Sequence, residues 1–173
     1  MNKRLAAHST SARWKIGKLR DDLDGLYVRA DPRSITDPEV ASDLGRYLCV
    51  RVSGYLEQAS GVILRDYCEK NSWGLVQSFA HSWLDKMPNL SADALIKFVK
   101  RFSSQHAGEL EVFLSTEERG TTLNALVGIR NDVAHGKQQG ISREQAWRYL
   151  EVVEQIVNWL LDQFDSMNNE SSA

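Results

Sequence analysis

The spacing of apolar residues predicts helices along most of the chain. Between residues 11 and 30, isoleucine and leucine recur every three or four positions among charged residues, which is typical of a helix with one apolar face. Asp31 ends this segment, because the residue before Pro32 is disfavoured in the helical conformation. A second helix is expected from Asp37, which can cap it, with Pro38 in the first turn, where its missing N–H costs nothing.

The second helix is predicted to be the longest and the most buried. Residues 37–71 carry apolar side chains over more than one narrow stripe, so this helix is expected to lie at the centre of the fold. Gly45, Gly54 and Gly61 lie inside it, although each costs up to about 1 kcal/mol relative to alanine in a helix. Either another backbone approaches these glycines closely, within the chain or across a dimer, or the helix kinks there.

A third helix is predicted directly after the long one. Asn71 or Ser72 can cap it, and a proline closes it some fifteen residues later. Val76, Phe79 and Leu84 recur at helical spacing and are expected to form its packed face.

The C-terminal half of the chain contains three more helical segments and one ambiguous stretch. Ser91 starts a fourth helix, whereas residues 106–120 could hold a short helix and are interrupted at Gly120. A helical face then runs from residue 123 to Gly136, where glycine stops it. Ser142 opens a capping box before the last helix, which has the most regular apolar stripe in the chain.

These elements predict an all-α fold, an antiparallel bundle of five or six helices. With 173 residues and no repeat or linker, the chain is expected to be one domain, with an ordered core over about residues 12–165 and flexible ends. Three prolines and eleven glycines leave little room for the frequent turns of an all-β fold.

Composition and cysteine usage narrow the possible functions. A net charge of −2 argues against a protein that coats nucleic acid with a large basic surface, but it allows a small site for one or two phosphates. Cys49 and Cys68 would lie about 28 Å apart along one helix, too far to pair with each other. Neither cysteine has a metal-ligand spacing, and no apolar run approaches transmembrane length. We therefore expect a reduced, cytoplasmic protein with no cofactor, no metal and no membrane contact.

Candidate chemistry gathers in residues 128–136. Arg130 and His135 lie on either side of Asn131, and Gly136 directly after them is expected to stop the helix. Side chains five residues apart point about 140° apart on a helix, so they converge only if the helix ends or unwinds between them. Two structural alternatives stay open: His135 could simply satisfy carbonyls at the helix C-terminus, and Arg130 could form a salt bridge to an acidic neighbour.

The spacing of this pair is a weak signal by itself. Arg101 and His106 repeat it in the same chain, and thirteen arginines with four histidines would give roughly one match by chance. The local context distinguishes the two pairs, because only Arg130 is followed directly by an asparagine and only His135 is followed directly by a glycine.

Residues 130–136 resemble the Arg-Asn-x-x-x-His signature of HEPN domains, helical modules many of which are metal-independent RNases. Residues 53–57, 95–102 and 123–127 are similar, in this order, to the branch of that family called RiboL-PSP. The resemblance covers about residues 40–160. It implies an all-α HEPN-like fold and RNA as the substrate.

The residue types suit the reaction that this resemblance implies. RNA is cut without a metal when the ribose 2′-OH attacks the phosphate, which leaves a 2′,3′-cyclic phosphate and a 5′-hydroxyl. A histidine such as His135 can exchange protons at neutral pH. The guanidinium of Arg130 can hold phosphate oxygens and stabilise the growing negative charge, and Asn131 is expected to orient the pair.

Two weaker candidates for substrate binding are Glu57 and Lys137. Glu57 matches an acidic position in the family pattern, with a buried carboxylate pairing Arg130 as the alternative. Lys137 could touch phosphate or be a solvated loop lysine. Tyr55 is better explained as a core aromatic than as a base-stacking residue.

The resemblance implies a homodimer whose two motifs line one cleft. We expect a toxin-like or phage-defence endoribonuclease that is restrained by an antitoxin or another regulatory partner. The alternative is a non-catalytic dimeric adaptor or RNA-binding module with the same fold. A third possibility is an unrelated helical protein in which the motif is a coincidence.

Overall fold

The computed structural model describes residues 11–137 and 140–165, which form seven α-helices, two 3₁₀ helices and no strand. The α-helices are α1 (Ala12–Arg29), α2 (Pro38–Asn71), α3 (Gly74–Leu84), α4 (Ala92–Lys100), α5 (Ser104–Ser115), α6 (Arg119–Ala134) and α7 (Arg143–Phe164); the 3₁₀ helices are η1 (Pro32–Ser34) and η2 (Thr116–Glu118). The predicted all-α fold is confirmed. There is one α-helix more than the expected five or six, because the ambiguous stretch forms α5. The predicted flexible ends lie outside the described residues.

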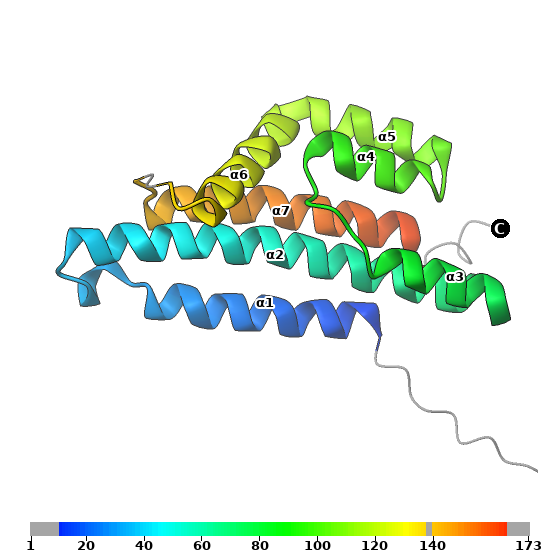
Figure 1. Ribbon diagram of the computed structural model, residues 1–173, viewed down its shortest axis with the longest axis horizontal. Coiled ribbons are helices and arrows are strands. Elements are labelled where there is room, and N and C mark those ends of the chain that lie inside the picture. The colour runs from blue at the N-terminus through cyan, green and yellow to red at the C-terminus, as the bar shows by residue number, and fades with distance from the viewer. Residues whose placement is uncertain (1–10, 138–139, 166–173) are drawn as a thin grey trace, which may run out of the picture.

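Three long helices, α1, α2 and α7, lie side by side along the long axis of the molecule (Figure 1). The hairpin of α4 and α5 covers one side, α6 crosses the long helices obliquely, and α3 extends beside the end of α2 (Figure 1). Helix α1 runs antiparallel to α7, since Arg13 near the start of α1 forms a salt bridge of 2.9 Å with Asp165, just after the end of α7.

The relation between α2 and α7 corrects the expected antiparallel bundle. Gly45 near the start of α2 lies against Ile141 just before α7, and the rings of Tyr67 and Phe164 near the two C-terminal ends are 5.3 Å apart. These two helices therefore run parallel. They can do so because residues 72–142 intervene, and this stretch carries the chain back to the end where α2 began (Figure 1).

The central position predicted for the long helix is confirmed. Twelve residues of α2 are buried, more than in any other described helix, and nine of them belong to one hydrophobic core that extends from α1 to α7. Tyr55 is part of this core, which agrees with its interpretation as a core aromatic. Cys49 and Cys68 are both buried in α2 and both are free thiols.

Local capping explains where several helices begin. Asp37 accepts a hydrogen bond from the N–H of Glu39 at 2.8 Å, while the hydroxyls of Ser91 and Ser142 cap α4 and α7 in the same way. The predicted starts of α2, α4 and α7 are thus confirmed.

The helix is interrupted not at Gly120, as predicted, but two or three residues earlier. Glu117 and Glu118 have left-handed backbone angles, with φ of 52° and 56°, and they form the corner between α5 and α6. Gly120 is in the first turn of α6, where an added Cβ would lie 3.1 Å from the carbonyl oxygen of Leu114. Its role is to allow this close packing, which periodicity alone does not indicate.

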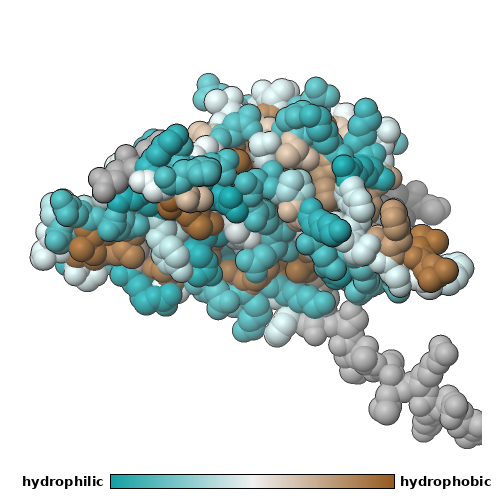
Figure 2. Space-filling model, viewed as in Figure 1, coloured by the Kyte–Doolittle hydropathy of each residue, from teal (hydrophilic) through white to brown (hydrophobic). Residues whose placement is uncertain are grey.

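The inward face expected for the third helix is wrong in part. Val76 and Phe79 are 67% and 70% exposed, and Leu84 is the residue of α3 that is buried. Val76 and Phe79, together with the exposed Trp73 and Leu75, form an apolar surface at the end of the molecule where α3 lies (Figure 2). The reason is that the start of α3 extends beyond the helices it could pack against. None of the helices in the described ranges is long and apolar enough to cross a membrane.

Candidate functional site

The candidate motif lies at the C-terminal end of α6. His135 caps the helix, and Gly136 follows with a left-handed φ of 73°. The N–H of Gly136 donates to the carbonyl of Val133 at 3.1 Å, and the N–H of Lys137 donates to that of Asp132 at 2.9 Å. These two bonds make a Schellman motif, in which the glycine stop satisfies carbonyls that the helix leaves free. The helix stop predicted at Gly136 is confirmed.

This stop does not bring Arg130 and His135 together within one chain. The backbone stays helical from Arg130 to Ala134, so the two side chains keep roughly the 140° separation of residues five apart. Arg130 is half-buried against the fold, whereas the ring of His135 is exposed. The unwinding between the two residues, on which the expected convergence depends, is not found, because the helix ends at His135 itself.

Arg130 occupies a half-buried position without a carboxylate partner. Among the described residues it forms no salt bridge within 4 Å, and its Nη1 lies 3.4 Å from Oδ1 of the neighbouring Asn131. A salt bridge was the structural alternative for this arginine, and it is not present in the described part of the chain. The guanidinium thus keeps donors available for an anion.

Glu57 on α2 is the acidic group that lies near this arginine. Its Oε1 is buried and accepts no hydrogen bond from any described residue. Burial raises the pKa of its carboxyl group, and the charge of Arg130 offsets part of that rise. Glu57 therefore feels the charge of Arg130 but is not paired with it. A buried acceptor without a donor costs free energy, which is a common property of residues kept for binding rather than for stability.

We expect Glu57→Gln to raise the melting temperature of the protein at neutral pH. The folded-state pKa of Glu57 lies above the unfolded value, so the carboxyl stabilises the fold in acid and loses that contribution as the pH rises and it ionises. Glutamine removes the buried charge and keeps the shape. Thermal melts at pH 7.5 and pH 4 would measure the effect, with Gln58→Glu, an exposed neighbour, as the control. A gain that does not shrink in acid would contradict this explanation.

Asn131 is connected to a distant part of the chain. Its Oδ1 accepts a hydrogen bond from Nδ2 of Asn89 at 3.1 Å, and Asn89 lies in the connection between α3 and α4 (residues 85–91). Sequence reasoning missed Asn89. It lies 42 residues from Asn131 and in no recognisable motif, so the sequence contains no signal for this contact.

His135 and Lys137, the two remaining candidate residues, differ in their surroundings. The imidazole of His135 is exposed and makes no hydrogen bond to any described residue. Lys137 is also exposed, but its Nζ lies 2.9 Å from Oδ1 of Asp132 on the same helix end. Lys137 is therefore partly neutralised, whereas His135 faces solvent or a partner.

The second pair with the same spacing has structural partners. The guanidinium of Arg101 lies 3.4 Å above the ring of Trp83, and Nδ1 of His106 is 3.1 Å from a carboxylate oxygen of Glu109. The His106 ring also packs edge-on against Phe164. The contacts of both side chains are accounted for by packing, which separates this pair from Arg130 and His135.

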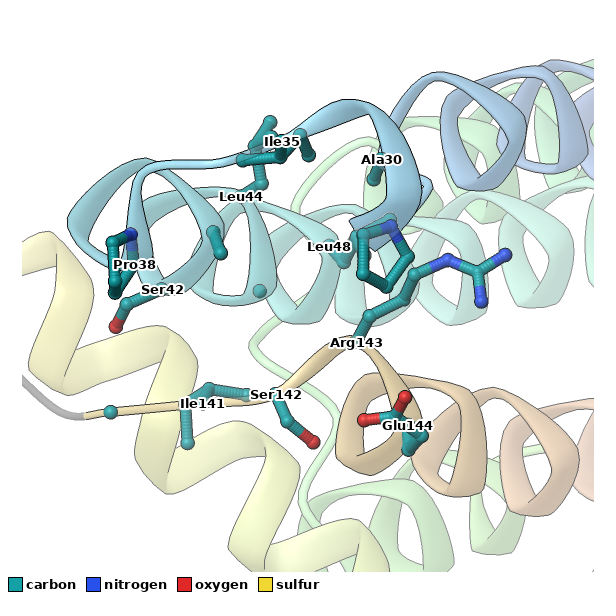
Figure 3. Close-up of a pocket in the computed structure, with 14 residues that line it drawn as sticks. Ala30, Ile35, Pro38, Ser42, Leu44, Leu48, Ile141, Ser142, Arg143 and Glu144 are labelled. Atoms are coloured by element: carbon teal, nitrogen blue, oxygen red, sulfur yellow. The ribbon is translucent and has the colours of Figure 1, made fainter.

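Two pockets in the described part of the chain are lined by residues outside the motif at 128–136. One pocket of about 420 Å³ lies between the start of α2 and residues 140–144 (Figure 3). Arg143, which lines it, donates to the carbonyl of Tyr27 at 3.2 Å. This pocket contains none of the predicted site residues. A groove of about 540 Å³ between α1, α2 and the end of α3 includes Glu57, with Lys15 and Lys18 on its rim. In the described ranges, no three His, Cys, Asp or Glu side chains are grouped so that they could hold a metal ion.

Comparison with protein families gives a match to the RiboL-PSP-HEPN family over residues 14–166. Comparisons with curated proteins and with solved structures give no match. The matched range includes all seven α-helices apart from the first residues of α1, and it contains every candidate site residue. The resemblance found in the sequence is thus confirmed over most of the chain. This chain belongs to the RiboL-PSP-HEPN family.

Proposed function

We propose that this chain is a metal-independent endoribonuclease with Arg130, Asn131 and His135 as its working side chains. The observation that carries the proposal is the state of Arg130. The arginine of the family signature is half-buried in this chain, and it has no carboxylate partner among the described residues. An arginine kept free in this way suits a phosphate ligand.

The reaction assigns one task to each side chain. The ribose 2′-oxygen loses its proton and bonds to phosphorus, and the 5′-oxygen of the next nucleotide leaves and takes up a proton. His135 is placed to exchange one of these protons, because its ring is exposed and makes no hydrogen bond to the described residues. Arg130 stabilises the charge that grows on the non-bridging oxygens. The products are a 2′,3′-cyclic phosphate and a 5′-hydroxyl.

A second copy of the chain would complete this site. Arg130 and His135 diverge within one chain, so a single copy offers one phosphate one of these groups at a time. Two motifs facing each other across a homodimer would place an arginine and a histidine on the same phosphate. We propose this arrangement for a toxin-like or phage-defence protein that acts on cytoplasmic RNA and is restrained by an antitoxin or another regulatory partner.

A non-catalytic RNA-binding module or adaptor is the second candidate. The separation of the Arg130 and His135 side chains favours this candidate. Arg130 and Lys137 near the helix end can bind phosphate without any proton transfer from His135. Such a protein would shift RNA in a mobility assay and leave it intact.

The test is the chemistry of the RNA ends. Purified protein incubated with RNA in excess EDTA is expected to release fragments that end in a 2′,3′-cyclic phosphate and begin with a 5′-hydroxyl, as read by mass spectrometry of the fragments. Wild-type protein that binds RNA but leaves it uncut over hours, or that leaves 5′-phosphate ends, would overturn the proposal. A mock purification from cells that lack the chain controls for contaminating ribonucleases.

A further inference from the structure

Two asparagines of α6 hold the end of the connection between α3 and α4 and the first residue of α4 against that helix. Asn124 Oδ1 accepts a hydrogen bond from the backbone N–H of Ala92 at 2.9 Å, and Asn131 Oδ1 accepts one from Asn89 Nδ2 at 3.1 Å. Residues seven apart on a helix lie within about 20° of each other, so both amides face the same side. Residues 89–92 thus meet α6 at two points, two turns apart, and only the contact at Asn131 belongs to the candidate motif.

The donors around Asn131 determine which way its amide points. A guanidinium can only donate, so the atom of Asn131 that faces Arg130 at 3.4 Å has to be the oxygen. Asn89 supplies a second and shorter donor to the same oxygen. The NH₂ group of Asn131 consequently points away from both, and it donates to no described residue.

Asn89 is itself held in place by its surroundings. Its backbone carbonyl accepts a hydrogen bond from the N–H of Ser91 at 3.1 Å, and the next residue, Leu90, is buried in the core. Pro88 precedes it and restricts the backbone on the other side. Asn89 is therefore a better anchor for the oxygen than Arg130, since hydrogen bonds weaken beyond about 3.2 Å.

We propose that Asn89 is a positioning residue, which holds the Asn131 amide so that its NH₂ group faces the scissile phosphate. The inference rests on the proposed ribonuclease function and adds to it a residue outside the motif. A free N–H donor beside a guanidinium can bind a non-bridging oxygen that Arg130 does not reach. Without Asn89, the amide of Asn131 can rotate and present its oxygen, which repels the phosphate.

Kinetics of two matched variants test this role. Asn89→Ala and Asn124→Ala each remove one hydrogen bond between residues 89–92 and the same face of α6, so both are expected to melt at similarly reduced temperatures. Asn89→Ala is expected to cut RNA roughly tenfold more slowly, whereas Asn124→Ala cuts at the wild-type rate. Asn89→Asp, nearly isosteric, offers only acceptors, turns the Asn131 amide round and lowers kcat further. Equal rates for Asn89→Ala and wild type, or equal losses in Asn89→Ala and Asn124→Ala, would overturn the proposal.

A second measurement does not depend on catalysis. The side-chain NH₂ signals of Asn131 in an amide NMR spectrum can be assigned by their disappearance in Asn131→Asp. They are expected to shift in the Asn89→Ala and Asn89→Asp variants and to stay unchanged in Asn124→Ala. Unchanged signals in both Asn89 variants would exclude the positioning role at any level of activity. Absence of RNA cleavage by the wild-type protein would instead reject the proposed function, and the NMR comparison would still decide whether Asn89 orients Asn131.

Discussion

His135→Ala is expected to lower the rate of RNA cleavage by about 10²–10⁴-fold, the usual effect of removing a general acid or base. Arg130→Ala is expected to lower it by about 10²–10³-fold, because a preorganised charge no longer stabilises the phosphate oxygens in the transition state. Arg130→Lys restores the charge but not the paired donors, so we expect it to recover only part of the lost rate. The measurement is the initial rate of cleavage of a labelled RNA in EDTA.

The chain provides its own control for these two variants. Arg101 and His106 have the same spacing, but they are held by Trp83 and Glu109. Alanine at either of these two positions is expected to lower stability slightly and leave the rate unchanged. Circular dichroism and melting curves would show that the Arg130 and His135 variants remain folded. Wild-type rates in the Arg130 and His135 variants, or an equal loss in the Arg101 and His106 variants, would show that the site is assigned wrongly.

Gly45→Ala is expected to destabilise the fold more than any other single methyl group added to α2. A Cβ at this position would lie 1.9 Å from the carbonyl oxygen of Ile141 and 2.8 Å from its carbonyl carbon. Both atoms belong to the backbone, so a rotamer change cannot relieve the clash, and the starts of α2 and α7 have to separate. We expect a loss of about 3 kcal/mol or more in the free energy of unfolding, which lowers the melting temperature by roughly 6–12 °C.

Gly54→Ala in the same helix is the matched control. The nearest heavy atom to its added Cβ would be Nε2 of Gln58 at 3.9 Å, an ordinary contact with a flexible side chain. Alanine is favoured over glycine in a helix, so this variant is expected to be as stable as the wild type or more stable by up to about 1 kcal/mol. Urea or thermal unfolding measures both. Equal stabilities of the Gly45 and Gly54 variants would contradict the close approach of Ile141.

The Gly45 contact also has a consequence for the candidate site. Ile141 lies five residues after Gly136, so the contact with α2 holds the chain soon after it leaves the motif. One of the two explanations left open for the helix glycines is therefore correct for Gly45, where a backbone of the same chain approaches closely. Gly54 and Gly61 have no such backbone neighbour among the described residues.

Much of the fold follows from signals that act within a few residues. Asp37, Ser91 and Ser142 start helices because their side chains accept a hydrogen bond from an N–H two or three residues later. Gly136 ends α6 because glycine adopts the left-handed conformation without strain. These contacts are local, so the sequence by itself determined the helical class, most helix starts and the position of the candidate motif.

Long-range packing decided what the sequence left open or predicted wrongly. Val76 and Phe79 have the spacing of a buried face, but α3 extends past its neighbours and leaves them exposed. The direction of α7 relative to α2 depends on where residues 72–142 return the chain, which no local pattern encodes.

In the candidate site, too, local signals determined some features and long-range packing determined others. The sequence by itself determined that Arg130, Asn131 and His135 lie in the last turns of one helix, because a helix stop is a local property. Only the tertiary structure decided that Arg130 lacks a carboxylate partner in the described part of the chain, that Glu57 lies near it, and that Asn89 holds Asn131. These relations join residues tens of positions apart. They depend on how whole helices pack, and the burial and hydrogen bonds that set them arise only when the core forms.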